Sequence, residues 1–83
     1  MEINIHPHAK ERLKERGASV EEIEITIRKG EQFQAKYGRK GFRHNFIFEN
    51  NWRGKKYNTK QIEAYAVWEN DAWLVVSLIT KFF

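Results

Sequence analysis

Three side chains near the amino terminus have the types and the spacing of an acid–base and phosphate-binding group. In "HPHAKERLKERG", residues 6–17, His8, Arg12 and Arg16 recur every four residues. On a helix, residues with this spacing stack into one slanting stripe. The dipole at a helix start disfavours an imidazolium, so a neutral His8 is available as a base. Arginine is well suited to bind phosphate oxygens beside it.

The same stripe has a simpler interpretation as a solvated helix face. Glu11 and Glu15 lie at helical spacings from Lys14 and Arg12, with which they could form ion pairs. From spacing alone, this interpretation is favoured over a site.

Two further candidates lie in segments with the two-residue period of strands. In "FRHNFIF", Phe42, Phe46 and Phe48 share one strand face with His44, so we expect His44 to face the apolar layer and Arg43 to face away from it. Arg43 could clamp a phosphate or simply face solvent, and the period does not decide between them. At the end of the last strand, Thr80 or Lys81 is expected to project into a groove beside the first helix.

A basic and aromatic segment, residues 49–60, has the composition of a mobile loop. It contains Trp52, Arg53, Lys55, Lys56 and Tyr57, and this mixture suits single-stranded nucleic acid, whose phosphates meet the charges while its bases stack on the rings. The alternative is a charged surface loop whose aromatic rings fold back onto the domain. Binding is slightly favoured because residues 31–61 contain eight Lys or Arg and two Asp or Glu.

Several classes of site are disfavoured by composition. The chain has no cysteine, and its three histidines lack the spacing of metal ligands. "GRKG" connects two predicted strands, so it is not a phosphate loop that opens a helix. We therefore expect no metal and no cofactor. With no apolar run near the ~18 residues of a membrane span and no signal-like amino terminus, we also expect a cytoplasmic protein without membrane contact.

The expected architecture is a single α+β domain over residues 1–83, because this length leaves no room for a second core. A helix is predicted over residues 7–16, and Ser19 and Glu22 have the spacing of a capping box that begins a second helix, ending near Gly30. Alternation then predicts four antiparallel strands, at residues 31–37, 42–48, 61–69 and 73–83. The order is ααββββ, with both helices packed on a four-stranded sheet.

"HAKERLKERGASVEEI", residues 8–23, resembles the opening of the DUF4258 family, and the likeness continues more weakly through "GFRHNFIF" and the two last predicted strands. The family resembles small metal-independent ribonucleases that include RelE-like toxins, whose ααββββ fold agrees with the order above. By resemblance, functional roles fall to His8 and Arg12, less firmly to Arg16, and by position to Arg43 and Thr80. The implied partners are RNA, free or as ribosome-bound mRNA, and a neutralising antitoxin protein.

The function expected from these observations is a toxin-type endoribonuclease that cleaves single-stranded RNA without metal, through attack by the RNA 2′-hydroxyl. The alternative is a non-catalytic RNA-binding or protein-interaction module on the same fold.

Overall fold

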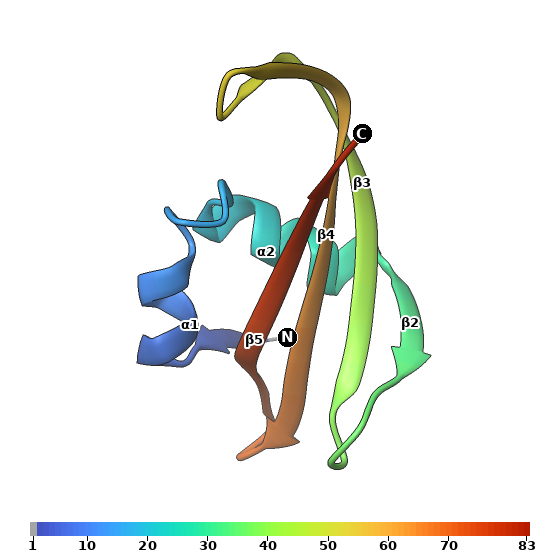
Figure 1. Ribbon diagram of the computed structural model, residues 1–83. Helices are drawn as coiled ribbons and strands as arrows, with labels where there is room; N and C mark the ends of the chain where they lie inside the picture. The colour runs from blue at the N-terminus through green and yellow to red at the C-terminus, as the bar shows by residue number, and fades with distance from the viewer. Residues whose placement is uncertain (1) are drawn as a thin grey trace.

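The computed structural model describes residues 2–83 (Figure 1). In chain order the elements are β1 (Glu2–Ile5), α1 (Pro7–Arg12), α2 (Val20–Lys29), β2 (Glu31–Gln34), β3 (Lys40–Trp52), β4 (Lys55–Glu69) and β5 (Ala72–Phe82). All five strands belong to one sheet in the order β1-β5-β4-β3-β2. β1 runs parallel to β5, whereas the other neighbouring strands are antiparallel.

The predicted fold class is wrong. The protein is mostly β, with a five-stranded mixed sheet and two short helices, and not a four-stranded antiparallel sheet preceded by two helices. The strand that was missed is β1, whose residues "EINI" alternate between exposed and partly buried over only four positions. Such a short alternation carries little signal, and its partner β5 lies at the other end of the chain.

The first helix is also shorter than predicted, since α1 ends at Arg12. The chain then continues in tight turns, in which the amide of Arg16 donates to the carbonyl of Arg12 at 3.0 Å. Gly17 follows with a φ of 70°, and a Cβ at this position would lie 2.9 Å from the ring of Trp52. Both the positive φ and the close approach require glycine here.

The second helix confirms its predicted start. The hydroxyl of Ser19 accepts a hydrogen bond from the amide of Glu22 at 3.2 Å, and the Glu22 carboxylate accepts one from the amide of Ser19 at 3.0 Å. This reciprocal pair satisfies two amides that have no partner within the helix. It therefore fixes where α2 begins.

The hydrophobic core lies between the helices and one face of the sheet (Figure 1). Ala9 and Leu13 come from α1 and the turn after it, and Ile23 and Ile27 come from α2. Opposite them the sheet contributes Phe42, Ile62, Ala64, Ala66, Val75 and Leu78. Burying one large apolar side chain contributes about 1.5–3 kcal/mol. The core therefore holds α1 along β5 and α2 across β3 and β4.

The predicted mobile loop at residues 49–60 is instead a hairpin made by the ends of β3 and β4, which arches above the helices in Figure 1. Arg53 and Gly54 form its two-residue turn, with φ angles of 52° and 83°. Two positive φ angles match the twist of a tight hairpin. A register shift between Ile47 and Asn50 bends the hairpin. The segment was predicted as a loop because its polar, glycine-containing composition is typical of loops and it has little apolar surface to bury.

Candidate functional site

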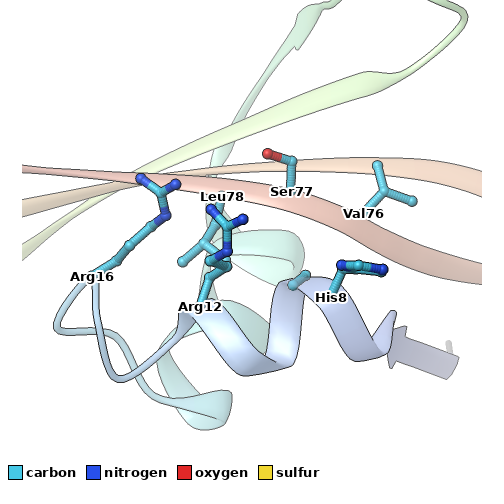
Figure 2. A pocket seen from close by; sticks show the side chains of 7 residues that line it. His8, Arg12, Arg16, Val76, Ser77 and Leu78 are labelled. Carbon is cyan, nitrogen blue, oxygen red and sulfur yellow. The ribbon is translucent and has the colours of Figure 1, made fainter.

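An open pocket lies between α1 and β5 (Figure 2). Its volume is about 180 Å³, and its lining residues are His8, Ala9, Arg12, Arg16, Val76, Ser77 and Leu78. The pocket exists because β1 pairs with β5 only from Ala72 to Val75. Beyond Val75, no strand within residues 2–83 covers this edge of β5, and α1 lies beside it instead.

The pocket brings together His8, Arg12 and Arg16, although α1 ends before Arg16. Figure 2 shows both guanidinium groups reaching from α1 and the following turn toward β5. Within residues 2–83 neither arginine forms an ion pair, and the alternative pairing of Glu11 and Glu15 with Lys14 or Arg12 is not formed. Both positive charges are therefore available to an anionic ligand.

One buried polar atom of Arg16 lacks a hydrogen-bond partner within residues 2–83. Its Nε is buried and has no hydrogen-bond partner in the described part of the chain. A buried donor without a partner costs about 1–3 kcal/mol. A ligand oxygen in the pocket is one way to remove this cost.

His8 lies at the opposite end of the row and is exposed. Its ring stacks on that of His6, with centroids 5.5 Å apart and planes 18° from parallel. The amide of His8 donates to Nδ1 of His6 at 3.1 Å, so His6 is the amino-terminal cap of α1. This role was not predicted because histidine is not a common cap, although Pro7 at the first helical position was a signal for it.

A second hollow, of about 220 Å³, continues the pocket past Arg16. It is lined by Glu15, Arg16, Trp52, Arg53, Thr80 and Phe82. The hydroxyl of Thr80 donates to the backbone carbonyl of Arg16 at 2.6 Å, and the guanidinium of Arg53 donates to the carbonyl of Glu15 at 2.8 Å. These two bonds tie the turn after α1 to β5 and to the hairpin. We call the two hollows together the α1–β5 groove.

The aromatic residues of the hairpin mostly fold back onto the domain. The ring of Trp52 stacks on Phe82 at 5.0 Å and lies 5.0 Å from the guanidinium carbon of Arg53. Tyr57 also packs on Phe82, at 5.7 Å. Both rings therefore have intramolecular partners, which corresponds to the alternative interpretation for these two side chains. Lys55 and Lys56 are exposed beside them, and neither forms an ion pair among residues 2–83.

Arg43 is not brought to the groove. It faces the side of the sheet away from the helices, as the alternation predicted, whereas His44 lies on the helix side against Phe46. The Nε of Arg43 is 3.0 Å from the Glu63 carboxylate, and Nη1 is 3.0 Å from that of Glu31. With both carboxylates so close, Arg43 has no free charge for a phosphate bound beside α1.

Glu63 is the centre of this outer cluster and was missed in the sequence. It is buried, and it also accepts a hydrogen bond of 2.7 Å from the hydroxyl of Tyr65 and one of 3.5 Å from Lys81. Burial raises the pKa of Glu63, but the hydrogen bonds from Tyr65 and Arg43 and the nearby positive charges outweigh it, so the net pKa is lowered. The hydrogen bond to Glu63 in turn raises the pKa of Arg43.

Two other features of the described residues bear on function. Among residues 2–83, no three His, Asp or Glu side chains gather as a metal-ligand set. None of the helices in this range is long and apolar enough to cross a membrane.

Comparison with known proteins identifies the family. A family model described as "Domain of unknown function (DUF4258)" matches residues 5–80. The chain belongs to this family. No curated protein and no solved structure matches it. The DUF4258 match includes the groove from His8 to Thr80, but its description assigns no activity, and the resemblance to RelE-like ribonucleases is not confirmed.

Proposed function

We propose that this DUF4258 protein is a toxin-type endoribonuclease that cleaves single-stranded RNA in the α1–β5 groove without a metal. One observation carries the proposal. His8, Arg12 and Arg16 line one open pocket, and neither arginine is paired with a carboxylate within residues 2–83. An imidazole beside two free guanidinium groups is the set of side chains that phosphate-ester chemistry uses.

The reaction uses the nucleophile that RNA itself carries. The 2′-oxygen attacks the adjacent phosphorus, its proton leaves, and the bond from phosphorus to the 5′-oxygen breaks as that oxygen gains a proton. His8 performs one of these two proton transfers, a contribution of about 10²- to 10⁴-fold. Arg12 and Arg16 stabilise the negative charge of the phosphorane, where one preorganised group contributes about 10²- to 10³-fold. Water in the open pocket carries the other proton.

The rest of the groove holds the substrate in this proposal. Arg53 lines the hollow that continues past Arg16, and the exposed Lys55 and Lys56 extend the positive surface along the hairpin. A strand of RNA laid along β5 meets these charges in succession. As a toxin, the protein acts on free RNA or on ribosome-bound mRNA and is neutralised by an antitoxin protein whose acidic segment covers the groove.

The test is cleavage of a mixed-sequence single-stranded RNA in EDTA, repeated with translating ribosomes present. The variants are His8→Ala and Arg12→Ala, with Lys10→Ala as the control because Lys10 is an exposed residue of α1 outside the groove. We expect wild type and Lys10→Ala to leave a 2′,3′-cyclic phosphate and a 5′-hydroxyl. A 3′-hydroxyl product would contradict attack by the 2′-oxygen, and a loss of less than about threefold in His8→Ala would remove His8 from the mechanism.

A second candidate is a non-catalytic RNA-binding module. The observation in its favour is that, within residues 2–83, His8 is the one histidine that lines the pocket and no carboxylate lines it. A groove with arginines and no acid–base chemistry would grip phosphates without cutting them. Binding of RNA with no turnover at any enzyme concentration, with or without ribosomes, would favour this candidate.

A further inference from the structure

A separate hollow lies on the outer face of the sheet, the face away from the helices. Its volume is about 400 Å³, within the size range of small-ligand sites. Strand pairing aligns Phe33, Gly41, Tyr65 and Ser77 in one row across β2, β3, β4 and β5. Three of these four residues line the hollow, which we call the outer pocket.

The floor of the outer pocket is aromatic. Phe33 lies directly over Gly41, since a Cβ on Gly41 would approach its ring to 2.3 Å. The rings of Phe33 and Tyr65 then meet edge to face, with centroids 6.0 Å apart. The absence of a side chain on Gly41 thus leaves space for the Phe33 ring to lie directly against the sheet. The result is an aromatic floor in which the guanidinium carbon of Arg43 lies 4.4 Å from the centre of the Phe33 ring, so the Phe33 ring already has a stacking partner.

The wall of the outer pocket comes from the turn between β2 and β3. Tyr37 there is 86% exposed and has a φ of 62°, which is uncommon for a large side chain. The guanidinium carbon of Arg39 lies 5.8 Å from its ring, and Lys36 is exposed beside them. In the part of the chain that the structure describes, neither Lys36 nor Arg39 forms an ion pair. An exposed ring and two unpaired cations therefore surround an aromatic floor.

Ser77 connects the outer pocket to the α1–β5 groove. It lines both the outer pocket and the pocket that contains His8, Arg12 and Arg16. Figure 2 shows its hydroxyl turned away from α1. β4 pairs with one edge of β5 here, but β1 stops pairing with the other edge at Val75. No strand of residues 2–83 covers that second edge beside Ser77, so a ligand can pass over it from one hollow to the other.

We propose that the outer pocket binds one nucleotide of the same single-stranded RNA, with its base against Tyr37 and Tyr65 and a phosphate on Lys36 or Arg39. This inference rests on the proposed function, because the adjoining nucleotides occupy the α1–β5 groove. Rings flanked by cations are the combination that holds single strands without sequence preference. The substrate is then a strand long enough to cross the β5 edge.

The test measures binding by fluorescence anisotropy with 2′-O-methyl oligonucleotides, in which the attacking hydroxyl is blocked. One probe is a trinucleotide that fills the groove alone, and the other is a longer oligomer that can cross the edge of β5. The variants are Tyr37→Asn, since asparagine tolerates a positive φ, and Lys36→Ala. Arg12→Ala reports on the groove, and Lys29→Ala is the charge control because Lys29 is exposed on α2 and lines neither hollow.

We expect Tyr37→Asn to weaken binding of the longer probe about tenfold, as the loss of one stacked base does, and to leave the trinucleotide unaffected. Arg12→Ala should weaken both probes. If Tyr37→Asn and Lys36→Ala match Lys29→Ala on both probes while Arg12→Ala weakens them, the outer pocket is overturned and the groove stands. If only the variants of the β2–β3 turn weaken binding, the outer pocket stands and the groove fails. No binding by wild type overturns both.

Discussion

The arginines of the α1–β5 groove and Arg43 on the outer face of the sheet differ in their partners. On the helix side, Arg12 and Arg16 line an open pocket and have no carboxylate partner among residues 2–83. On the outer face, Arg43 is held between Glu63 and Glu31 and lies 4.4 Å from the ring of Phe33. The difference shows that neighbours, and not residue type, decide whether a cation can bind a ligand.

The outer cluster has a structural explanation. Glu31, Arg43, Glu63 and Lys81 lie on β2, β3, β4 and β5, so their contacts cross four neighbouring strands. The buried Glu63 carboxylate accepts hydrogen bonds from Arg43 on β3 and Lys81 on β5, so it links β4 to both neighbouring strands. The α1–β5 groove has no such cluster, because Arg12 and Arg16 have no carboxylate partner among residues 2–83.

The largest expected difference between the two faces is in catalysis. Under the proposed function, Arg12→Ala should lower RNA cleavage by about 10²- to 10³-fold, because it removes positive charge from the phosphorane. Arg43→Ala should leave cleavage per folded molecule within about threefold, since Arg43 faces away from the groove. The measurement is single-turnover cleavage, with the folded fraction determined by circular dichroism. Equal losses in the two variants would mean that the substrate reaches both faces at the reacting phosphate.

A second difference concerns stability within the outer cluster. Glu63→Gln removes the charge of a buried carboxylate and should lower the free energy of unfolding by about 1.5–3 kcal/mol, the range for hydrogen bonds to charged groups. Glu31→Gln is the matched control, because its carboxylate also pairs with Arg43 but its side chain is 73% exposed. An exposed pair of this kind contributes about 0–1 kcal/mol. Urea denaturation measures both, and similar losses would show that Glu63 is not the centre of the cluster.

The same carboxylate should make stability depend on pH. The folded-state pKa of Glu63 is lowered, so its contribution is fully present above the unfolded value of about 4.3 and is lost as pH falls through the folded value. Between about pH 5 and pH 3, the unfolding free energy of wild type should therefore fall more steeply than that of Glu63→Gln. Parallel curves from urea denaturation at each pH would show that Glu63 has no lowered pKa.

Patterns among residues close together in the sequence were sufficient to predict some elements. The Ser19–Glu22 capping box predicted the start of α2, and the alternation around Arg43 and His44 predicted which way each side chain faces. Both depend on residues close in the chain. The pairing of β1 with β5 joins the two ends of the chain, and four residues of alternation did not indicate it. Because β1 was not predicted, the predicted fold class was wrong.

The candidate site was likewise predicted only where the signal lay in residues close together in the sequence. Four-residue spacing placed His8, Arg12 and Arg16 on one side although the helix stops at Arg12, because Leu13 keeps helical backbone angles and the turn continues from it. The opening beside β5 was not predictable, since it results from where β1 stops pairing. Nor did the pattern distinguish Glu63 from other acidic residues in strands, because two of its three donors, Arg43 and Lys81, come from the neighbouring strands β3 and β5.

The smallest predicted effect tests whether the groove's positive surface continues onto the hairpin. Lys55 is exposed near the turn at Arg53 and Gly54, where a strand of RNA leaving the groove would pass. Losing one phosphate contact should reduce the slope of log affinity against log salt by about 0.7, with little change in sequence preference. Lys55→Ala should show this change in a salt titration of RNA binding, and Lys29→Ala should not. Because the slope counts phosphate contacts directly, an unchanged slope in Lys55→Ala would end the RNA path at Arg53.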